Sequence, residues 1–180
     1  PDISNQIISS IPEATPEYTK TLIKIKRALG DNDGAMETAI AALEEKPDHG
    51  VMFAILRLSW DLGSMEDVVI YSEKILSDKP TQPVAHRFRL RALVKIGDVK
   101  RIETAISDTL NYLPDFIEAH RVMIDIGFHE FEDWTMVKNH CESILHIDPT
   151  DRRSLCHLIH SQLKLGNFGE VADLITKSTN

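Results

Sequence analysis

Apolar residues recur along this chain with the spacing of amphipathic helices, in stretches of three to four turns separated by polar residues. Between Pro47 and Pro80 the pattern occurs twice: first at Met52, Ile55, Leu56, Ser59 and Leu62, then at Val68, Val69, Ser72, Ile75 and Leu76. Apolar positions at i, i+3, i+4 and i+7 form one face of a helix. The segment between two prolines therefore predicts a pair of helices.

Prolines and glycines mark the same interval along most of the chain. Five prolines lie 33 to 35 residues apart: Pro12, Pro47, Pro80, Pro114 and Pro149. Three glycines each lie 17 residues before the next of these prolines, namely Gly30, Gly63 and Gly97, and Gly166 stands at the matching place in the repeat that follows Pro149. Glycine suits the tight turn between two helices, and proline cannot continue the second one. A fixed period near 34 residues with two phased marks indicates an array of stacked repeats.

The pattern predicts an all-α chain of about five antiparallel helix pairs. The expected helices are residues 16–29, 34–46, 49–62, 65–78, 83–96, 99–112, 116–130, 133–146, 151–165 and 168–177. They group into repeats at 16–47, 49–80, 83–114, 116–149 and 151–180, within a domain that covers 13–180. Residues 1–12 are expected to be the remnant of a preceding helix and its closing proline, in a longer polypeptide. The fourth repeat departs most, because Glu132 stands where the glycine is expected.

Period, helix pairs, turn glycine and closing proline together resemble the tetratricopeptide repeat family over nearly the whole chain. Residues 165–168, with Val171 three positions on, and residues 144–149 look like that family's turn and repeat-closing segments. Met52, Leu56 and Ser59 fill places where the family has an aromatic residue, a glycine and a tyrosine, so relatives with longer helix-pair repeats remain an alternative. The resemblance implies a right-handed α-α superhelix whose first helices line the concave surface and bind proteins.

Charge is segregated between the two helices of each repeat. The formal net charge is −8, yet the expected first helices carry thirteen bases against six acids, and the second helices reverse this balance. Segregation by helix becomes segregation by surface once the pairs stack. The resemblance then places the basic set in the concave groove and the acidic set on the convex back.

Three bases hold the same place in successive repeats: Lys24, Arg57 and Arg91. Further bases and aromatic residues flank them on the same helix faces, namely Lys20, Arg27, Phe53, Trp60, Arg87 and Lys95, and the series stops at Ile126. Registered cations with aromatic neighbours predict an anion-binding groove. The alternative is a solvated basic surface on which Phe53 and Trp60 only pack against the next repeat. Among family members that clamp a terminal carboxylate, Lys20 matches the first lysine, whereas Lys24 and Ala54 stand where asparagines are expected.

Motifs of catalysis and metal binding do not occur in the sequence. There is no phosphate-binding glycine loop, nucleophile elbow or His-Glu-x-x-His motif. Residues 31–34 fit a polar turn better than a calcium loop, and Cys156, His157 and His160 lack a full ligand set. We therefore predict no catalytic residue, no cofactor and no metal. Cys141 and Cys156 both fall at apolar phases of expected helices and are too few for a disulfide framework, which favours a reduced, cytoplasmic location without membrane insertion.

The leading functional hypothesis is a non-catalytic scaffold that binds an acidic peptide or protein segment. The alternative is an accessory module of a larger enzyme, for example a polysaccharide-making glycosyltransferase whose catalytic domain lies elsewhere. Nucleic acid is not an expected partner, because the net charge of −8 would repel a long polyanion. We also expect self-association or intramolecular packing through the terminal repeats, where Ile3, Ile7 and Ile11 and then Val171, Leu174 and Ile175 leave apolar faces. Trp134 and Phe168 are expected to wedge between the helices of their repeats.

Overall fold

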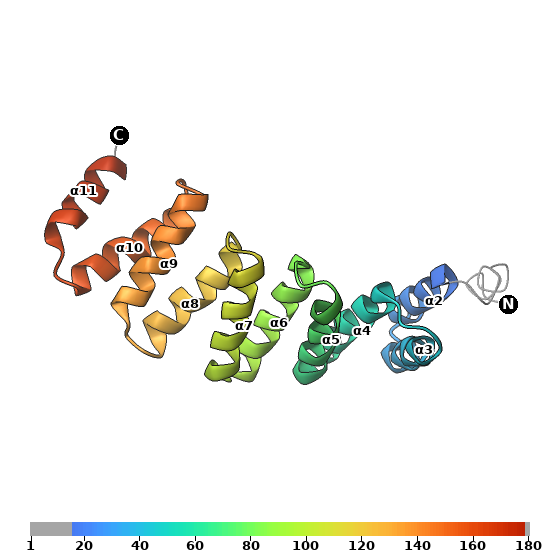
Figure 1. The fold of residues 1–180 in the computed structure, drawn as a ribbon. Helices are drawn as coiled ribbons and strands as arrows, with labels where there is room; N and C mark the ends of the chain where they lie inside the picture. Colours follow the sequence, from blue (N-terminus) through green and yellow to red (C-terminus); the bar gives the residue numbers. More distant parts are fainter. Residues whose placement is uncertain (1–15, 179–180) are drawn as a thin grey trace. The chain divides into compact units, whose positions relative to one another are not determined.

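The computed structural model describes residues 16–178, and within this range the chain forms ten helices and no strand (Figure 1). The helices are α2 (Pro16–Ala28), α3 (Asn32–Glu45), α4 (His49–Leu62), α5 (Met65–Asp78), α6 (Pro83–Ile96), α7 (Val99–Tyr112), α8 (Ile117–His129), α9 (Trp134–Ile147), α10 (Arg152–Lys164) and α11 (Phe168–Ser178). Every observed boundary lies within two residues of the predicted one. The all-α prediction is confirmed.

The chain divides into two compact parts, residues 1–99 and 100–180. We call them the N-terminal block, which holds α2 to α6, and the C-terminal block, which holds α7 from its second residue onward through α11. In the N-terminal block each helix packs on the next, and α2 also packs on α4. In the C-terminal block α8 packs on α9, α9 on α10, and α10 on α11. Turns of two to four residues join the two helices of each repeat, so these two helices run antiparallel.

The turns between paired helices depend on left-handed backbone. Gly63 has a φ of 78°, and its neighbour Ser64 donates a backbone hydrogen bond back to Ser59, which closes the end of α4. Gly30, Gly97 and Gly166 have φ values from 78° to 81° at the corresponding places. In the fourth repeat Glu132 takes this role with a φ of 49°. The turn conformation therefore survives there at the cost of the strain that a Cβ introduces.

Aspartates start several of the helices. The carboxylates of Asp48 and Asp151 accept hydrogen bonds from the backbone amides of Val51 and Ser154, at the first turns of α4 and α10. Asp31 and Asp133 cap α3 and α9 in the same way. Each cap satisfies an amide that has no partner within its own helix.

Each block has its own apolar core. In the N-terminal block a cluster of fully buried side chains joins α2, α3 and α4: Ile23, Ala35, Ala39, Val51, Ile55 and Leu58. In the C-terminal block the corresponding cluster joins α8, α9 and α10: Ile124, Val137, Cys141, Ile144 and Leu158. Burial raises the pKa of the Cys141 thiol to about 12, which keeps it protonated. The cores bury one face of each helix and leave the opposite faces available to solvent.

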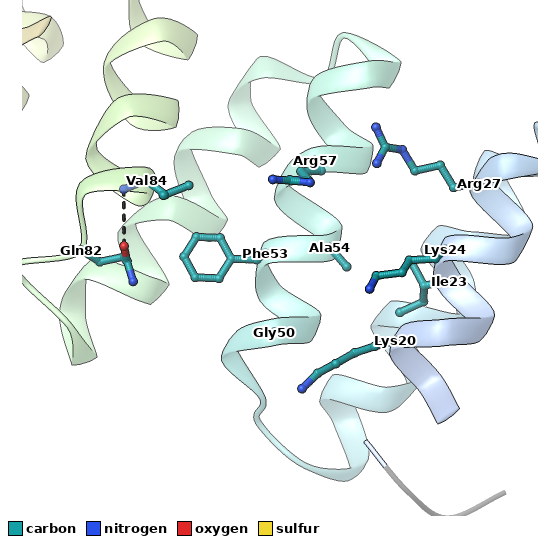
Figure 2. Close-up of a pocket in the computed structure, with 10 residues that line it drawn as sticks. All are labelled: Lys20, Ile23, Lys24, Arg27, Gly50, Phe53, Ala54, Arg57, Gln82 and Val84. Carbon is teal, nitrogen blue, oxygen red and sulfur yellow. Dashed lines mark hydrogen bonds between the residues drawn. The ribbon is translucent and has the colours of Figure 1, made fainter. Parts of the chain in front are cut away.

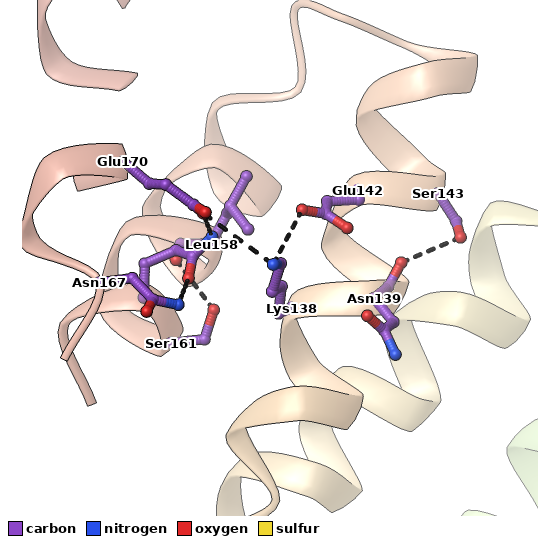
Figure 3. A network of polar contacts seen from close by, with 9 residues as sticks. Lys138, Asn139, Glu142, Ser143, Leu158, Ser161, Asn167 and Glu170 are labelled. Carbon is purple, nitrogen blue, oxygen red and sulfur yellow. Dashed lines mark hydrogen bonds and ion pairs between the residues drawn. The ribbon is translucent and has the colours of Figure 1, made fainter. Parts of the chain in front are cut away.

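The last helix is held by a polar network as well as by apolar packing. Glu170 on α11 accepts from the amide of the buried Gln162 on α10 and lies 3.9 Å from the ammonium of Lys138 on α9. Lys138 also pairs with Glu142 at 3.8 Å (Figure 3). The side-chain amide of Asn167 donates to the side-chain oxygen Oε1 of Gln162 at 2.7 Å. These contacts fix α11 through its first turn.

Some expectations about single side chains fail. Trp134 packs edge-on against Phe128 with ring centroids 5.1 Å apart, as expected of a wedge between α8 and α9. Phe168 at the equivalent place is 69% exposed, so the wedge prediction is wrong there. Cys156 is exposed rather than on the apolar face. Val171 is buried while Ile175 is 48% exposed; Ile3, Ile7 and Ile11 lie outside the described residues.

Candidate binding groove

A cavity of about 420 Å³ opens on the first helices of the N-terminal block. Its wall consists of residues from α2, α4 and the start of α6: Lys20, Ile23, Lys24, Arg27, Gly50, Phe53, Ala54, Arg57, Gln82 and Val84 (Figure 2). Five of the nine residues predicted from the sequence for a ligand site are among them, namely Lys20, Lys24, Arg27, Phe53 and Arg57. The helix register thus brings them to one cavity, and their role in binding stays a prediction.

Lys20 forms an ion pair with Asp48, the residue that caps α4, the first helix of the next repeat. Its ammonium lies 3.1 Å from a carboxylate oxygen of Asp48. Partial burial opposes the ionisation of Asp48, but the Val51 amide and Lys20 outweigh it, so the pKa of Asp48 is lowered. Gly50 makes this arrangement possible, because a Cβ there would come within 2.5 Å of the Lys20 side chain.

Arg27 is also paired. Its Nε donates to Asp61 on α4 at 2.8 Å, and both side chains are more than a third exposed. An exposed pair of this kind adds about 0–1 kcal/mol to stability. It matters here mainly because it neutralises one of the cations at the rim of the cavity.

Lys24 and Arg57 differ from these two bases. Both are exposed at the cavity, and neither has an ion-pair or hydrogen-bond partner among residues 16–178. Lys24 extends from α2 toward Ala54, and Arg57 extends from α4 above Phe53 (Figure 2). The two form the uncompensated positive part of the cavity.

Apolar side chains make up much of the remaining wall. Phe53 is half-buried and points toward Gln82 and Val84 at the start of α6 (Figure 2). Ile23 and Ala54 contribute from α2 and α4 and continue into the core cluster of this block. The cavity therefore offers a surface for an apolar group beside a place for an anion.

The other four predicted site residues lie outside the cavity wall. Trp60 packs edge-on against Phe88 with ring centroids 5.7 Å apart, and the ammonium of Lys95 lies 4.2 Å from the centre of the Trp60 ring. Arg87 and Arg91 are exposed on α6. The contact with Phe88 agrees with the interpretation of Trp60 as a residue that packs on the next repeat. Phe53, in contrast, faces the cavity.

Equivalent positions in the C-terminal block carry no such unpaired bases. Counted back six residues from the left-handed turn residue, the place of Lys24 and Arg57 falls to Ile126, which is buried, and to His160. The ring of His160 packs on those of Phe128 and Trp134, with ring centroids 4.9 Å and 5.4 Å apart. Two bases of these first helices are paired, Arg121 with Asp151 and Arg153 with Asp125 at 3.0 Å, and the Lys164 ammonium lies 5.4 Å from the centre of the Trp134 ring.

The C-terminal block holds a histidine pair that sequence reasoning missed. His120 and His140 meet through their Nδ1 atoms at 2.9 Å, beside a cavity of about 400 Å³. The Nε2 atom of His120 lies 3.1 Å from the carbonyl oxygen of Pro114, which only accepts, so this nitrogen carries the hydrogen. Burial, and then the adjacent His120, lower the pKa of His140 to about 4. A sequence signal existed, because His86 has the same place relative to Pro80 and contacts its carbonyl oxygen at 2.7 Å.

Residues 16–178 contain neither a metal-ligand cluster nor a membrane-spanning helix. No group of three or more His, Cys, Asp or Glu side chains in this range converges as metal ligands would. No helix in it combines the length and the apolar character that crossing a lipid bilayer requires.

Comparison with solved structures identifies the fold. The chain superposes on a tetratricopeptide repeat protein from Parabacteroides merdae with a TM-score of 0.71 and 15% identity, over 91% of this chain and 67% of that one. MamA from Desulfovibrio magneticus gives a TM-score of 0.65 and 17% identity, over 89% and 91% of the two chains. YrrB, described as a tetratricopeptide repeat protein with an unusual peptide-binding site, gives 0.66 and 10% over 96% and 89%. No protein-family model and no curated protein matches the sequence.

Proposed function

We propose that this chain, whose fold is that of tetratricopeptide repeat proteins, is a non-catalytic interaction scaffold that binds an acidic peptide or protein segment. The ligand site is the cavity of the N-terminal block. The observation that carries this proposal is the pair formed by Lys24 and Arg57, two exposed bases without a carboxylate partner among the described residues, at one cavity.

Electrostatics favour a short acidic segment over a long polyanion. Lys20 and Arg27 at the same cavity are already paired with carboxylates, so the local excess of positive charge is small. The whole chain carries a formal net charge of −8. A nucleic acid would meet repulsion over most of its length, whereas a few carboxylates placed at Lys24 and Arg57 would not. A short acidic peptide is thus the ligand class that fits both the local charge of the cavity and the net charge of the whole chain.

The fold supports the same choice. YrrB, a similar structure, is described as having a peptide-binding site, and helical repeats present extended surfaces suited to peptides. Fold similarity alone assigns no ligand. The proposal therefore depends on the residues of this cavity and not on those of its structural relatives.

Selection from a library of random dodecapeptides displayed on phage tests the proposal. The wild-type chain is expected to enrich peptides rich in Asp and Glu, and a Lys24→Glu/Arg57→Glu variant is expected to lose that enrichment. Lys79→Glu/Lys100→Glu is the matched control, because both lysines are exposed and the change in net charge is the same. Circular dichroism on all three proteins checks that the helices are intact.

Binding of a selected peptide should also weaken as salt rises. Exposed charges are screened within about 10 Å at 0.1 M ionic strength and about 3 Å at 1 M. We expect at least a fivefold loss of affinity between these conditions. Equal enrichment on the wild-type and on the Lys24→Glu/Arg57→Glu variant would show that the cavity is a solvated basic surface and not a ligand site.

A further inference from the structure

The cavity of the N-terminal block is divided into a charged part and an apolar part. Lys20, Lys24 and Arg27 all belong to α2, whereas Phe53 on α4 points away from them toward Val84 at the start of α6 (Figure 2). Arg57 lies on the same helix as Phe53, one turn further on. A ligand that lies across the first helices would meet cations at Lys24 on α2 and Arg57 on α4, and an apolar surface at Phe53 and Val84.

We propose that this division sets the specificity of the site: it recognises a peptide in which a carboxylate side chain and a large apolar side chain lie within about three residues of each other. This inference rests on the proposed function and adds the apolar requirement to it. The carboxylate pairs with Lys24 or Arg57, and the apolar side chain packs on Phe53 and Val84.

The spacing follows from the dimensions of the two structures. Packed helices lie about 8–10 Å apart. One residue of an extended peptide spans about 3.3 Å, so about three residues bridge neighbouring helices. Charge complementarity places the carboxylate at Lys24 or Arg57 and leaves Phe53 and Val84 for the apolar side chain.

The ion pairs of Lys20 and Arg27 also favour a ligand that carries an apolar side chain beside its carboxylate. Lys20 is held against Asp48, and Arg27 against Asp61, so these two bases line the cavity with their charges already balanced. A purely acidic peptide would gain from Lys24 and Arg57 alone and would leave Phe53 half-exposed. Burial of an apolar side chain there adds a second, independent contribution.

The test uses a labelled peptide from the library selection and fluorescence anisotropy. Its apolar residue is replaced by Ser in one derivative, and its acidic residues are replaced by Gln in another. On the wild-type chain the Ser derivative should bind about tenfold more weakly, as expected for one buried apolar side chain. On Phe53→Ala the same replacement should cost less than about threefold, because the partner surface is gone.

Two further variants keep the result interpretable. Val84→Gln tests the other wall of the apolar part, outside the core cluster of this block. Phe131→Ala removes an exposed aromatic from the C-terminal block and should change nothing. Thermal melts identify any variant that is unfolded, and such a variant is replaced by Phe53→Gln or Val84→Ser.

The outcomes separate the two proposals. Acidic peptides that bind equally with and without the apolar residue, and that ignore Phe53→Ala and Val84→Gln, would overturn this inference and leave the acidic-peptide function intact. A peptide whose Gln derivative binds as well as the original would instead overturn the acidic-peptide function. Coupling between the apolar residue and Phe53, together with loss of binding in the Gln derivative, supports both.

Discussion

The N-terminal and C-terminal blocks are built on the same repeat, yet their first-helix faces have opposite chemistry. In the N-terminal block Lys24 and Arg57 stand at a cavity without carboxylate partners among the described residues. In the C-terminal block the equivalent places hold the buried Ile126 and His160, which packs on Phe128, and the bases Arg121 and Arg153 are paired with aspartates. The left-handed turns are thus common to the two blocks, while exposed bases without a carboxylate partner at a cavity occur on the first helices of the N-terminal block.

Substitution of the aspartates that cap first helices should give the largest difference in stability between the two blocks. Asp48 and Asp151 both cap a first helix and pair with a base from the preceding repeat, but the side chain of Asp151 is 9% exposed and that of Asp48 is 30% exposed. Asp151→Ala also removes the partner of Arg121, whose Nε is buried although its side chain is 40% exposed. We expect a loss of about 2 kcal/mol in the free energy of unfolding for Asp151→Ala and about 1 kcal/mol for Asp48→Ala.

Urea denaturation followed by circular dichroism measures both values. Asp133→Ala is the control for the cap alone, because Asp133 caps α9 without a paired base among the described residues. Equal losses for Asp151→Ala and Asp133→Ala would show that the pair with Arg121 contributes nothing.

Acid should weaken the C-terminal block first. Burial and His120 lower the pKa of His140 to about 4, below the ordinary value of 6.5, so the folded state binds fewer protons than the unfolded state between these values. Stability from this group is present above pH 6.5 and is lost as the pH falls toward 4. We expect the melting temperature to drop by several degrees between pH 7 and pH 5 and expect His140→Gln to remove most of that drop.

The interval between pH 7 and pH 5 lies above the pH at which most carboxylates titrate. The drop in melting temperature within it is therefore assigned to histidine. The pKa of His157 is also lowered, by burial and then by Arg153, so His157→Gln serves as a parallel variant. A drop that persists in full in His140→Gln would contradict the assignment.

The turns should respond in opposite directions in the two blocks. Gly63 has a positive φ and no neighbour within 4 Å of a built Cβ, so Gly63→Ala introduces backbone strain without a clash and should cost about 1 kcal/mol. Glu132 already bears that strain at a φ of 49°, and Glu132→Gly should stabilise by less than about 1 kcal/mol. Chemical denaturation gives both values. Gly169→Ala is the control for the loss of a glycine without strain: it lies at a helical position with open space around it and should stabilise by less than about 1 kcal/mol.

Sequence was sufficient for the fold because local chemistry determines it. Proline ends one repeat, glycine permits the left-handed turn, and apolar spacing defines the helix between them, so each boundary follows from a few neighbouring residues. Glu132 shows the limit of that reasoning, since its departure was predicted but the survival of the left-handed turn was not.

The candidate site was predictable only in part. Register identified Lys24 and Arg57, because equivalent positions in successive repeats face the same way. It could not show that Lys20 and Arg27 are neutralised by Asp48 and Asp61, since those partners lie 28 and 34 residues away and on other helices. Nor could it show that Arg91 lies outside the cavity, or that His120 meets His140, because both depend on how helices pack.

The pairing of a base with the next repeat's cap aspartate also bears on how the array comes apart. Lys20 with Asp48, and Arg121 with Asp151, each link the first helix of one repeat to the first turn of the following one. In a linear array such links are nearest-neighbour energies, and their strength decides whether repeats melt together or separately. The less exposed link belongs to the C-terminal block, so α8 and α10 should exchange their amide hydrogens as one cooperative unit, while α2 frays from α4 at lower free energy.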